Sequence, residues 1–548
     1  MILATALFLA SAFLCRLVWY KRFIQYDGFP QLPSSLLLGH WKIYHSIMQR
    51  GSLGRDYDHI FSEIHDMLGR PHLVLMDFRP LSRPVVFIAS HEIAEQISRP
   101  TKLFPTSIPR VDLGHMKPVI GQTSILSAEG DEWKSLRKTF NPLFARQNLL
   151  TLLPTILDKT MLFVNHLDRL SESKAEVSLV SLITRLIYDI MGATVLDIDL
   201  DAQHSDQGQQ GELVRAFTKL IGAYLDHKIN LPWWFNPAGE LKRRRLGQRV
   251  DSLLKSTIRR RHEERQQQRY YGKGKKQAQS PRLSSSIISL SLQDADTQVL
   301  SEDLVNQTCD QVRTFLVAGR DPPSVTLAWV FYEISRTPRV QAAIQAELDV
   351  LFGPGTDADA VRSGLASPAG PNLLNGMVYI AAVLKETLRL HTPASTARYS
   401  PAGSGLVVTM PTGEKLDLDG VVIYNCDSII HRDPAVFGPM ADYFMPERWL
   451  DDKPDRTKTA IPPSAWRPFE RGPRACIGQE FATIQMQVIV AVVARQYEFT
   501  KVGLGALALD ERTGRPVLGA DGQYETQSHV YNVSLSCFLP KYSVCLTV

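Results

Sequence analysis

A cysteine near the C-terminal end lies in a pattern of small, aromatic and basic residues. The segment reads Phe469-Glu-Arg-Gly472-Pro-Arg474-Ala-Cys476-Ile-Gly478. A cysteine in a turn can direct its sulfur at a metal only where the neighbouring backbone comes close to the bound group, which favours glycine at 472 and 478. Arg474 can pair with an acidic group of a cofactor, and Phe469 can pack beside the sulfur to exclude water. Such a set is expected of a thiolate ligand to haem iron, where the thiolate pushes electron density onto the metal.

The apolar run that begins at Ile477 predicts a helix over residues 478–497, directly after the cysteine. The positive end of its dipole would help to keep the sulfur charged. The other cysteines, at positions 15, 309, 426, 537 and 545, are scattered and form no CxxC pair or cysteine and histidine cluster. Cys476 is therefore expected to act alone, in a reducing compartment.

The cysteine segment closely resembles the haem-binding loop of the cytochrome P-450 family, and the resemblance extends over nearly the whole chain. Glu386-Thr-Leu-Arg389 resembles the family's ExxR helix, in which two charges three residues apart lie on one face. Phe444-Met-Pro-Glu-Arg448 follows where the family supplies a second arginine to that network. The resemblance implies that Glu386, Arg389 and Arg448 lock the cysteine loop in place.

Further positions match the family's haem contacts. Trp133 and Arg137 lie four residues apart in one predicted helix and resemble the pair that hydrogen-bonds a propionate. Taken alone, the pair is better explained as a core tryptophan and a surface arginine. Arg398 lies where the family has another propionate-binding arginine, in addition to Arg474.

A predicted helix over residues 302–336 departs from the family pattern at its centre, which reads Ala-Gly-Arg-Asp-Pro-Pro-Ser from residue 318. The family pattern is Ala-Gly, any residue, an acid and then threonine. Ala318, Gly319 and Asp321 match it, so the resemblance places them at the haem and oxygen site. Pro322 stands in the position of the family's proton-relaying threonine.

Two consecutive prolines remove two backbone donors and crowd the preceding carbonyls, so we expect the helix to kink at Pro322. Proline also lacks the hydroxyl that the threonine uses in proton delivery. A water held by Asp321, by Ser324 or by a substrate hydroxyl would replace it. In the alternative reading, Asp321 forms a salt bridge to Arg320 and the prolines only shape the pocket.

Residues 2–20 are apolar apart from Arg16 and end in an aromatic pair before Lys21. Their length lies within the roughly 17 to 25 residues that a helix needs to cross a bilayer. The positive flank predicts a single-pass anchor with the remaining chain in the cytosol, at the endoplasmic reticulum membrane by the family resemblance. A cleaved secretory signal is the alternative, although no basic stretch precedes the apolar run. Residues 21–40 form a proline-rich linker.

The chain has 548 residues, 44% of them hydrophobic and 21% charged, which excludes a disordered or collagenous protein. Its net charge is +5, yet residues 242–276 hold 14 basic and only 3 acidic residues. The remainder is therefore net acidic, and a nucleic-acid partner is not expected. The basic segment is more typical of a solvated helix face than of a phosphate or lipid site.

Apolar spacing typical of helices dominates the body, with a few β-rich stretches. The predicted helices cover 131–147, 151–170, 178–196, 211–226, 240–268, 302–336, 338–352, 376–391 and 478–497. The β-rich stretches are 85–89 and 406–410, and residues 414–424 carry turn residues between apolar runs. The connections are a mobile loop at 266–286 and a Gly/Pro-rich segment at 353–374. We expect a mainly α fold with small β-sheets, the cytochrome P-450 fold. It would form a single catalytic domain over residues 41–548.

The resemblance implies a membrane-anchored monooxygenase that contains haem b and inserts one oxygen atom of dioxygen into a lipophilic small molecule. Electrons would come from NADPH-cytochrome P-450 reductase, with cytochrome b5 as an optional second donor. The resemblance points to fungal enzymes of specialised metabolism, so a terpenoid, alkaloid or polyketide is the expected substrate. Because Pro322 replaces the threonine, a haem-thiolate isomerase, dehydratase or peroxide-using enzyme is the alternative. The complete cysteine loop argues against a third class, a silent haem- or lipid-binding protein.

Overall fold

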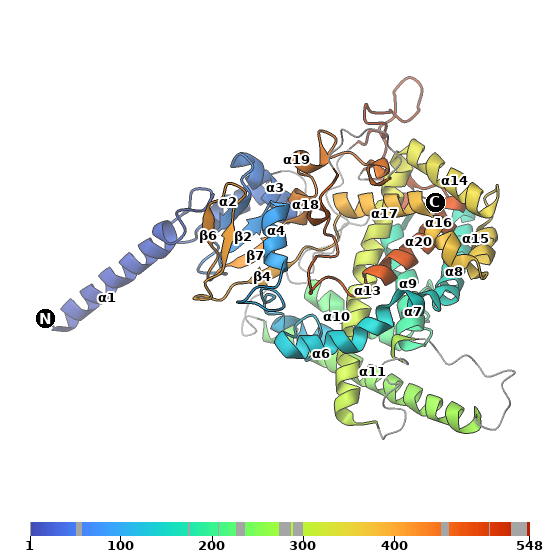
Figure 1. The fold of residues 1–548 in the computed structure, drawn as a ribbon, viewed down its shortest axis with the longest axis horizontal. Coiled ribbons are helices and arrows are strands. Elements are labelled where there is room, and N and C mark those ends of the chain that lie inside the picture. The colour runs from blue at the N-terminus through green and yellow to red at the C-terminus, as the bar shows by residue number, and fades with distance from the viewer. Residues whose placement is uncertain are drawn as a thin grey trace. The chain divides into compact units, whose positions relative to one another are not determined.

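The chain folds into two compact units, mainly helical with small sheets (Figure 1). The computed structural model describes residues 2–50, 57–173, 176–206, 208–225, 236–272, 286–288, 300–450, 460–503, 505–527 and 545–547. Unit 1 comprises 1–111, 394–442 and 456–476, and unit 2 comprises 112–393, 443–455 and 477–548. The mainly α fold class with small sheets is confirmed.

Unit 1 is built on a four-stranded sheet that joins segments from both ends of the chain. The strand order is β1 (Leu73–Met76), β2 (Val85–Ile88), β7 (Val422–Asn425) and β4 (Ala397–Tyr399). Strand β2 pairs in parallel with β7, and the other two pairings are antiparallel. A separate hairpin joins β5 (Val407–Thr409) to β6 (Lys415–Asp417). Residues 414–424 thus contain β6 and the first residues of β7, with the turn residues between them.

Apolar side chains cover both faces of this sheet. Helix α4 (His91–Ser98) packs Ile93 and Ile97 against Leu73 and Val86 on one face. On the other face, α3 (Tyr57–Met67) contributes Phe61, whose ring stacks on Phe87 with a centroid distance of 4.8 Å. Unit 1 also contains α2 (Trp41–Met48), α18 (Asp427–Ile430), α19 (Pro434–Phe437) and the 3-10 turn η8 (Pro463–Ala465).

The apolar N-terminal segment forms α1 (Ile2–Trp19), which continues into one π-helical turn, η1 (Tyr20–Ile24). An 18-residue window of the 23-residue helical segment Ile2–Ile24 has a mean hydropathy of 2.0 and no buried share, so the segment is long and apolar enough to cross a bilayer. Helix therefore extends four residues into the predicted linker. The segment Leu179–Leu196 passes the same test but is 67% buried, as expected of a core helix.

A buried ion pair holds the base of the N-terminal helix to unit 1. The Arg22 guanidinium lies 2.5 Å from Asp77, and their side chains are 6% and 3% exposed. Arg22 also donates to the carbonyl of Leu36 at 3.0 Å, while Arg79 donates to Asp77 at 2.9 Å. Burial alone would raise the pKa of Asp77, but the hydrogen bonds and charges of Arg79 and Arg22 lower it. The base of the N-terminal helix is thus attached to unit 1 by ion pairs as well as by the covalent chain.

Unit 2 contains the helical core. Its helices are α5 (Lys117–Ile120), α6 (Gly130–Phe140), α7 (Arg146–Leu150), α8 (Leu153–Ser173), α9 (Leu179–Met191), α10 (Glu212–Leu225), α11 (Pro237–Gly272), α13 (Glu302–Arg336), α14 (Pro338–Phe352), α15 (Ala358–Ala366), α16 (Gly370–Gly376), α17 (Val378–Leu390) and α20 (Gln479–Gln496). The shorter turns are η2 (Gly114–Met116), η3 (Asn141–Phe144), η4 (Gly192–Leu196) and η7 (Pro446–Trp449), and β3 (Glu176–Ser178), β9 (Cys545–Thr547) and β8 (Thr500–Lys501) form a small sheet.

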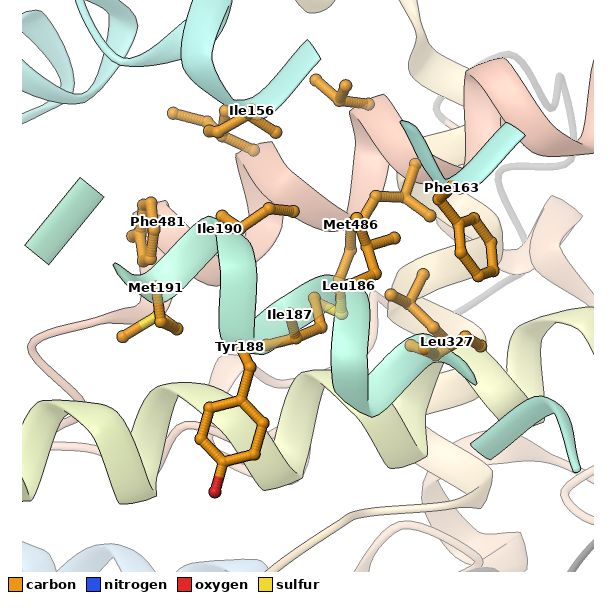
Figure 2. Packing of buried hydrophobic residues seen from close by; sticks show 14 of the residues in the cluster. Ile156, Phe163, Leu186, Ile187, Tyr188, Ile190, Met191, Leu327, Phe481 and Met486 are labelled. Carbon is orange, nitrogen blue, oxygen red and sulfur yellow. The ribbon is translucent and has the colours of Figure 1, made fainter. Parts of the chain in front are cut away.

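Helices α8, α9, α13 and α20 enclose the centre of the unit 2 core. Figure 2 shows Phe163 of α8, Leu186 of α9, Leu327 of α13 and Met486 of α20 among its members. Helix α20 is buried from Ile484 to Arg495, and residues 488–494 within this stretch are all apolar. This rigid bundle fixes α13, whose centre carries the proposed oxygen-site residues.

Two of the predicted connections are wrong in part. Residues 266–272 of the expected mobile loop belong to α11, and residues 273–285 lie outside the described chain. The Gly/Pro-rich segment 353–374 contains α15 and most of α16. Asp357 caps α15 by accepting a hydrogen bond from the Asp359 N–H at 2.8 Å, which stabilises a helix too short for clear periodicity.

Candidate functional site

The predicted site residues are divided between the two units. Unit 1 holds Arg398, Phe469, Gly472, Arg474 and Cys476. Unit 2 holds Trp133, Arg137, Ala318, Gly319, Asp321, Ser324, Glu386, Arg389, Arg448 and Gly478.

The cysteine loop of unit 1 is closed by its own backbone. The Cys476 N–H donates to the Phe469 carbonyl at 2.8 Å, and the Ala475 N–H donates to the Gly472 carbonyl at 3.1 Å. Gly472 has φ +75°, and a Cβ there would lie 2.2 Å from the Ser98 carbonyl oxygen at the end of α4. Only glycine fits this close approach. The resulting loop leaves Cys476 exposed while Arg474 is only 2% exposed.

The three charged residues assigned to a locking network lie together in unit 2. Arg389 donates to both carboxylate oxygens of Glu386, at 2.8 and 2.7 Å, and both side chains are fully buried. Arg448, on η7, donates to Glu386 at 2.9 Å. The Trp449 indole and the Met445 N–H each donate to the same carboxylate at 2.9 Å. Glu386 therefore joins α17 to the segment 443–450.

The remaining arginine and tryptophan candidates occupy different surroundings. Trp133 is 7% exposed in the core of unit 2, and Arg137 follows one turn later on α6, half-buried. Arg398, on β4 of unit 1, is 1% exposed and donates to the Ser107 hydroxyl at 3.1 Å and to the Ile108 carbonyl at 3.3 Å. Arg398 is thus fixed by hydrogen bonds within unit 1.

The model of the family described as Cytochrome P-450 matches residues 39–511, most of the chain. The chain belongs to the cytochrome P-450 family. It is accordingly an oxidoreductase, and membership implies a haem cofactor.

Several curated family members are similar over most of this chain. Cytochrome P-450 monooxygenase polC of Polytolypa hystricis is 27% identical over 499 residues, which cover 87% of this chain and 83% of the relative. Cytochrome P-450 monooxygenase acrF of Aspergillus aculeatus is 29% identical, with 77% and 83% covered. A bifunctional cytochrome P-450/NADPH-P-450 reductase of Gibberella moniliformis is 25% identical, with 81% of this chain but 37% of the relative covered.

The centre of α13 carries the departure from the family's usual sequence. The helix continues through Pro322 and Pro323 without a break. Arg320 Nε lies 2.8 Å from the Asp321 carboxylate, and the two side chains are 14% and 10% exposed. The Arg320 guanidinium also lies over the Tyr188 ring of α9, 4.8 Å from its centroid. Asp321 is therefore held beside a largely buried cation, as the salt-bridge reading of the sequence expects.

The residues around Asp321 on α13 have defined contacts or roles in packing. The Ser324 hydroxyl donates to the Arg320 carbonyl at 2.7 Å. A Cβ at Gly319 would lie 2.4 Å from the Met191 methyl group, so this glycine permits close packing of α13 on α9. The prolines have no N–H, so the carbonyls of Ala318 and Gly319 receive no helical hydrogen bond from them.

Two exposed positions fit a haem group in chemical terms. Cys476 is an exposed thiol in a loop whose backbone is hydrogen-bonded on itself, which suits a fixed single thiolate ligand. Ala318 is exposed although α13 is buried from residue 308 to 316 and again from 323 to 334. A small side chain on an open stretch of a core helix suits a flat aromatic cofactor.

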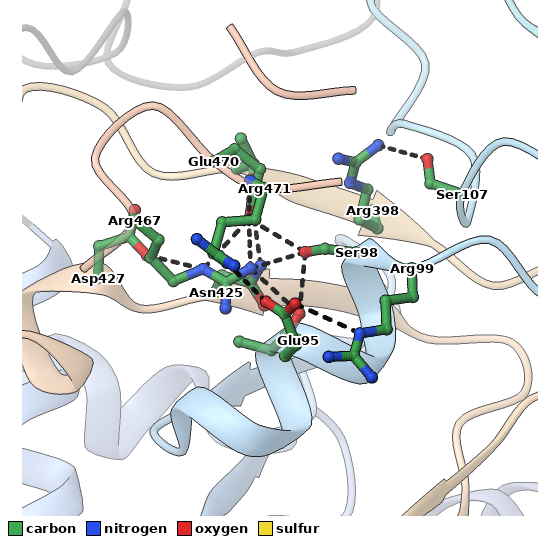
Figure 3. A network of polar contacts seen from close by, with 12 residues as sticks. Glu95, Ser98, Arg99, Ser107, Arg398, Asn425, Asp427, Arg467, Glu470 and Arg471 are labelled. Carbon is green, nitrogen blue, oxygen red and sulfur yellow. Dashed lines mark hydrogen bonds and ion pairs between the residues drawn. The ribbon is translucent and has the colours of Figure 1, made fainter. Parts of the chain in front are cut away.

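Sequence analysis did not single out two further residues of the cysteine loop, Arg467 and Glu470. Their side chains are 0% and 6% exposed and form an ion pair within unit 1 (Figure 3). Glu470 has φ +55°, a left-handed conformation that a non-glycine residue seldom adopts. The sequence shows an acidic residue directly after Phe469. Its structural role could not be predicted, because the residues that it contacts are distant in sequence.

Proposed function

We propose that this protein is a haem-thiolate monooxygenase that oxidises a lipophilic small molecule, by hydroxylation, epoxidation or a related insertion of one oxygen atom. The observation that carries the proposal is the exposed Cys476 in its hydrogen-bonded loop, in a chain of the cytochrome P-450 family. Cys476 ligates the iron of haem b as a thiolate. The bound haem supplies the iron centre at which dioxygen is activated.

Four side chains would bind the two haem propionates, the arginines by charge and Trp133 through the N–H of its neutral indole. We assign this role to Arg474 and Arg398 in unit 1, and to Trp133 and Arg137 in unit 2. Arg474 and Arg398 are 2% and 1% exposed, so each would offer its donors with little competition from water. Phe469 would shield the sulfur, and Gly478 would let the chain enter α20 close to the cofactor.

We assign proton delivery to Asp321, with Arg320 beside it. A guanidinium 2.8 Å from the carboxylate favours its charged form and restricts its orientation. Pro322 offers no hydroxyl, and the Ser324 hydroxyl already donates to the Arg320 carbonyl. A water molecule would then carry the proton to the oxygen site. This water could donate hydrogen bonds to the Asp321 carboxylate and to the carbonyls of Ala318 and Gly319.

The absence of a hydroxyl group at Pro322 favours one alternative function. If no hydroxyl relays a proton at Pro322, a haem-thiolate isomerase, dehydratase or peroxide-using enzyme would operate without the missing group. These reactions do not require the stepwise reduction and protonation of dioxygen. The paired state of Asp321 and Arg320 is compatible with this second function.

We propose electron supply by NADPH-cytochrome P-450 reductase, with cytochrome b5 as an optional donor. The bifunctional relative of Gibberella moniliformis, whose name joins both activities in one chain, supports this pairing. The apolar helix Ile2–Ile24 supports a single-pass anchor, and we place the protein at the endoplasmic reticulum membrane with its catalytic body in the cytosol. Similarity to fungal monooxygenases supports a specialised metabolite, such as a terpenoid, alkaloid or polyketide, as substrate.

One reconstitution tests the proposal. The full chain is purified in detergent, and its reduced carbon monoxide complex should show the absorbance band of thiolate-ligated haem, which Cys476→Ala should abolish. Product formation from a panel of terpenoids, alkaloids and polyketides should require both NADPH and reductase. Turnover with peroxide alone, or with no electron source, would favour the alternative, and a wild-type protein without the thiolate band would overturn both.

A further inference from the structure

The Glu470 carboxylate is the centre of a buried polar cluster in unit 1 (Figure 3). One of its oxygens accepts from Arg467 Nε at 3.1 Å, from the Ser98 hydroxyl at 3.1 Å and from the Arg471 N–H at 3.1 Å. The other accepts from Asn425 Nδ2 at 3.0 Å and from the Thr396 hydroxyl. Both oxygens are therefore occupied by donors alone, which suits a carboxylate and no neutral side chain.

These donors belong to the framework of unit 1. Ser98 ends α4, Thr396 precedes β4, and Asn425 ends β7. Glu470 thus connects the cysteine loop to a helix and to two neighbouring strands of the sheet. Arg471 adds a second connection to α4, because its Nε donates to Glu95 at 2.8 Å.

The position of Glu470 in the loop relates this cluster to the cysteine. Glu470 directly follows Phe469, whose carbonyl accepts the Cys476 N–H at 2.8 Å. Its φ of +55° is unfavourable for a residue with a side chain, so the surrounding contacts must hold it there. A change at the carboxylate would therefore move the carbonyl that closes the loop.

A second buried acid near Arg467 provides a contrast. Asp427 lies 4.0 Å from Arg467 Nε, and its side chain is 4% exposed. Burial, followed by the nearby Glu470 charge, raises the pKa of Asp427 well above its usual range. Burial also acts to raise the pKa of Glu470, but the charge and hydrogen bonds of Arg467 and Thr396 lower it to about 2. The two buried acids of this cluster thus have pKa values shifted in opposite directions.

We propose that Glu470 is a positioning residue for Cys476: its carboxylate fixes the Phe469 carbonyl and so holds the cysteine sulfur in the orientation that ligates iron. The inference rests on the proposed function, in which Cys476 binds haem. Glu470 acts through the loop backbone and does not itself contact the cofactor.

The test compares Glu470→Gln with Asp427→Asn in the full-length haem protein. Glutamine keeps the size of the side chain but carries an NH₂ group, which must face either the Arg467 side or the Asn425 side of the cluster. It therefore repels one set of donors. Asparagine at 427 is the matched control, because it changes the second buried acid of the same cluster, which lies 4.0 Å from Arg467 Nε. Thr396→Val is a milder variant, because it removes one donor to Glu470 and keeps the charge.

The readout is the reduced carbon monoxide spectrum followed over time, with far-UV circular dichroism as a check on folding. In Glu470→Gln we expect the thiolate-type band to be replaced by the shifted band of a neutral or displaced sulfur. This replacement should be about tenfold faster than in wild type, because hydrogen bonds to a charged group contribute a free energy that corresponds to at least a tenfold change. Asp427→Asn should match wild type, and Thr396→Val should fall between them.

Each result has a defined meaning. A wild-type band that is equally stable in Glu470→Gln and Thr396→Val would overturn the positioning role and leave the proposed function intact. A wild type without the band would overturn the proposed function itself. If Glu470→Gln does not fold, Thr396→Val decides: accelerated band loss in a folded variant supports the proposal, and wild-type behaviour refutes it.

Discussion

Replacing Glu386 with glutamine should destabilise unit 2 strongly, because this buried carboxylate accepts hydrogen bonds from both Arg389 and Arg448. All of the Glu386 and Arg389 side-chain surface is buried, and the Arg448 side chain is 9% exposed. Removing one partner of a buried ion pair typically costs about 3–5 kcal/mol, since the other charges remain without compensation. A domain of this size loses roughly 2 °C of melting temperature per kcal/mol, so we expect a fall of about 6–10 °C.

A matched control is the exposed pair between α8 and α15. Asp158 lies 3.1 Å from Arg362, with side chains 65% and 47% exposed, so Asp158→Asn should cost at most about 1 kcal/mol. Calorimetry at one scan rate, with circular dichroism in parallel, compares the two variants. We expect the loss of stability to depend on how deeply an ion pair is buried and not on the number of ion pairs. Equal melting temperatures for Glu386→Gln and Asp158→Asn would refute this expectation.

Three other outcomes are expected. Pro322→Thr should change the ratio of product formed to NADPH consumed, and an unchanged ratio would place this position outside the proton path. Because the pKa of Glu470 is lowered to about 2, its stabilising contribution is complete above about pH 5 and is lost as the pH falls toward 2. Urea unfolding should show this loss in wild type but not in Glu470→Gln. Asp77→Asn should release Arg22 and speed tryptic cleavage after it, as mass spectrometry would measure; identical cleavage rates would mean that the ion pair does not hold the helix base.

The long helices could be predicted from the sequence because their apolar residues repeat over many turns. Helix α13 coincides with the predicted residues 302–336, even though two prolines interrupt its donors. Neighbouring helices bury most of its side chains, and this packing outweighs the local cost of the prolines. The short helix α15 could not be found in this way, although Asp357 followed by apolar Ala358, Val361 and Leu365 was a usable capping signal.

The site was predictable where chemistry depends on neighbours in sequence. Cys476, Gly472 and Arg474 lie within five consecutive positions, so this motif can be recognised from the sequence without a structure. Glu470 was not recognisable, because its hydroxyl and amide donors Ser98 and Asn425 are 372 and 45 residues away. The Arg320 contact with Tyr188 likewise depends on how α9 packs on α13. Tertiary packing, and not local propensity, brings these groups together.

The parallel pairing of β2 with β7 has a consequence for synthesis on the ribosome. Val85 pairs with Val422, which emerges about 340 residues later, or roughly 20–70 s at ordinary translation speeds. During that interval the newly made hairpin β1–β2 has an open edge that cannot yet bond to its natural neighbour. Nascent chains stalled before residue 422 should therefore engage chaperones through this hairpin, and those extended beyond residue 425 should release them.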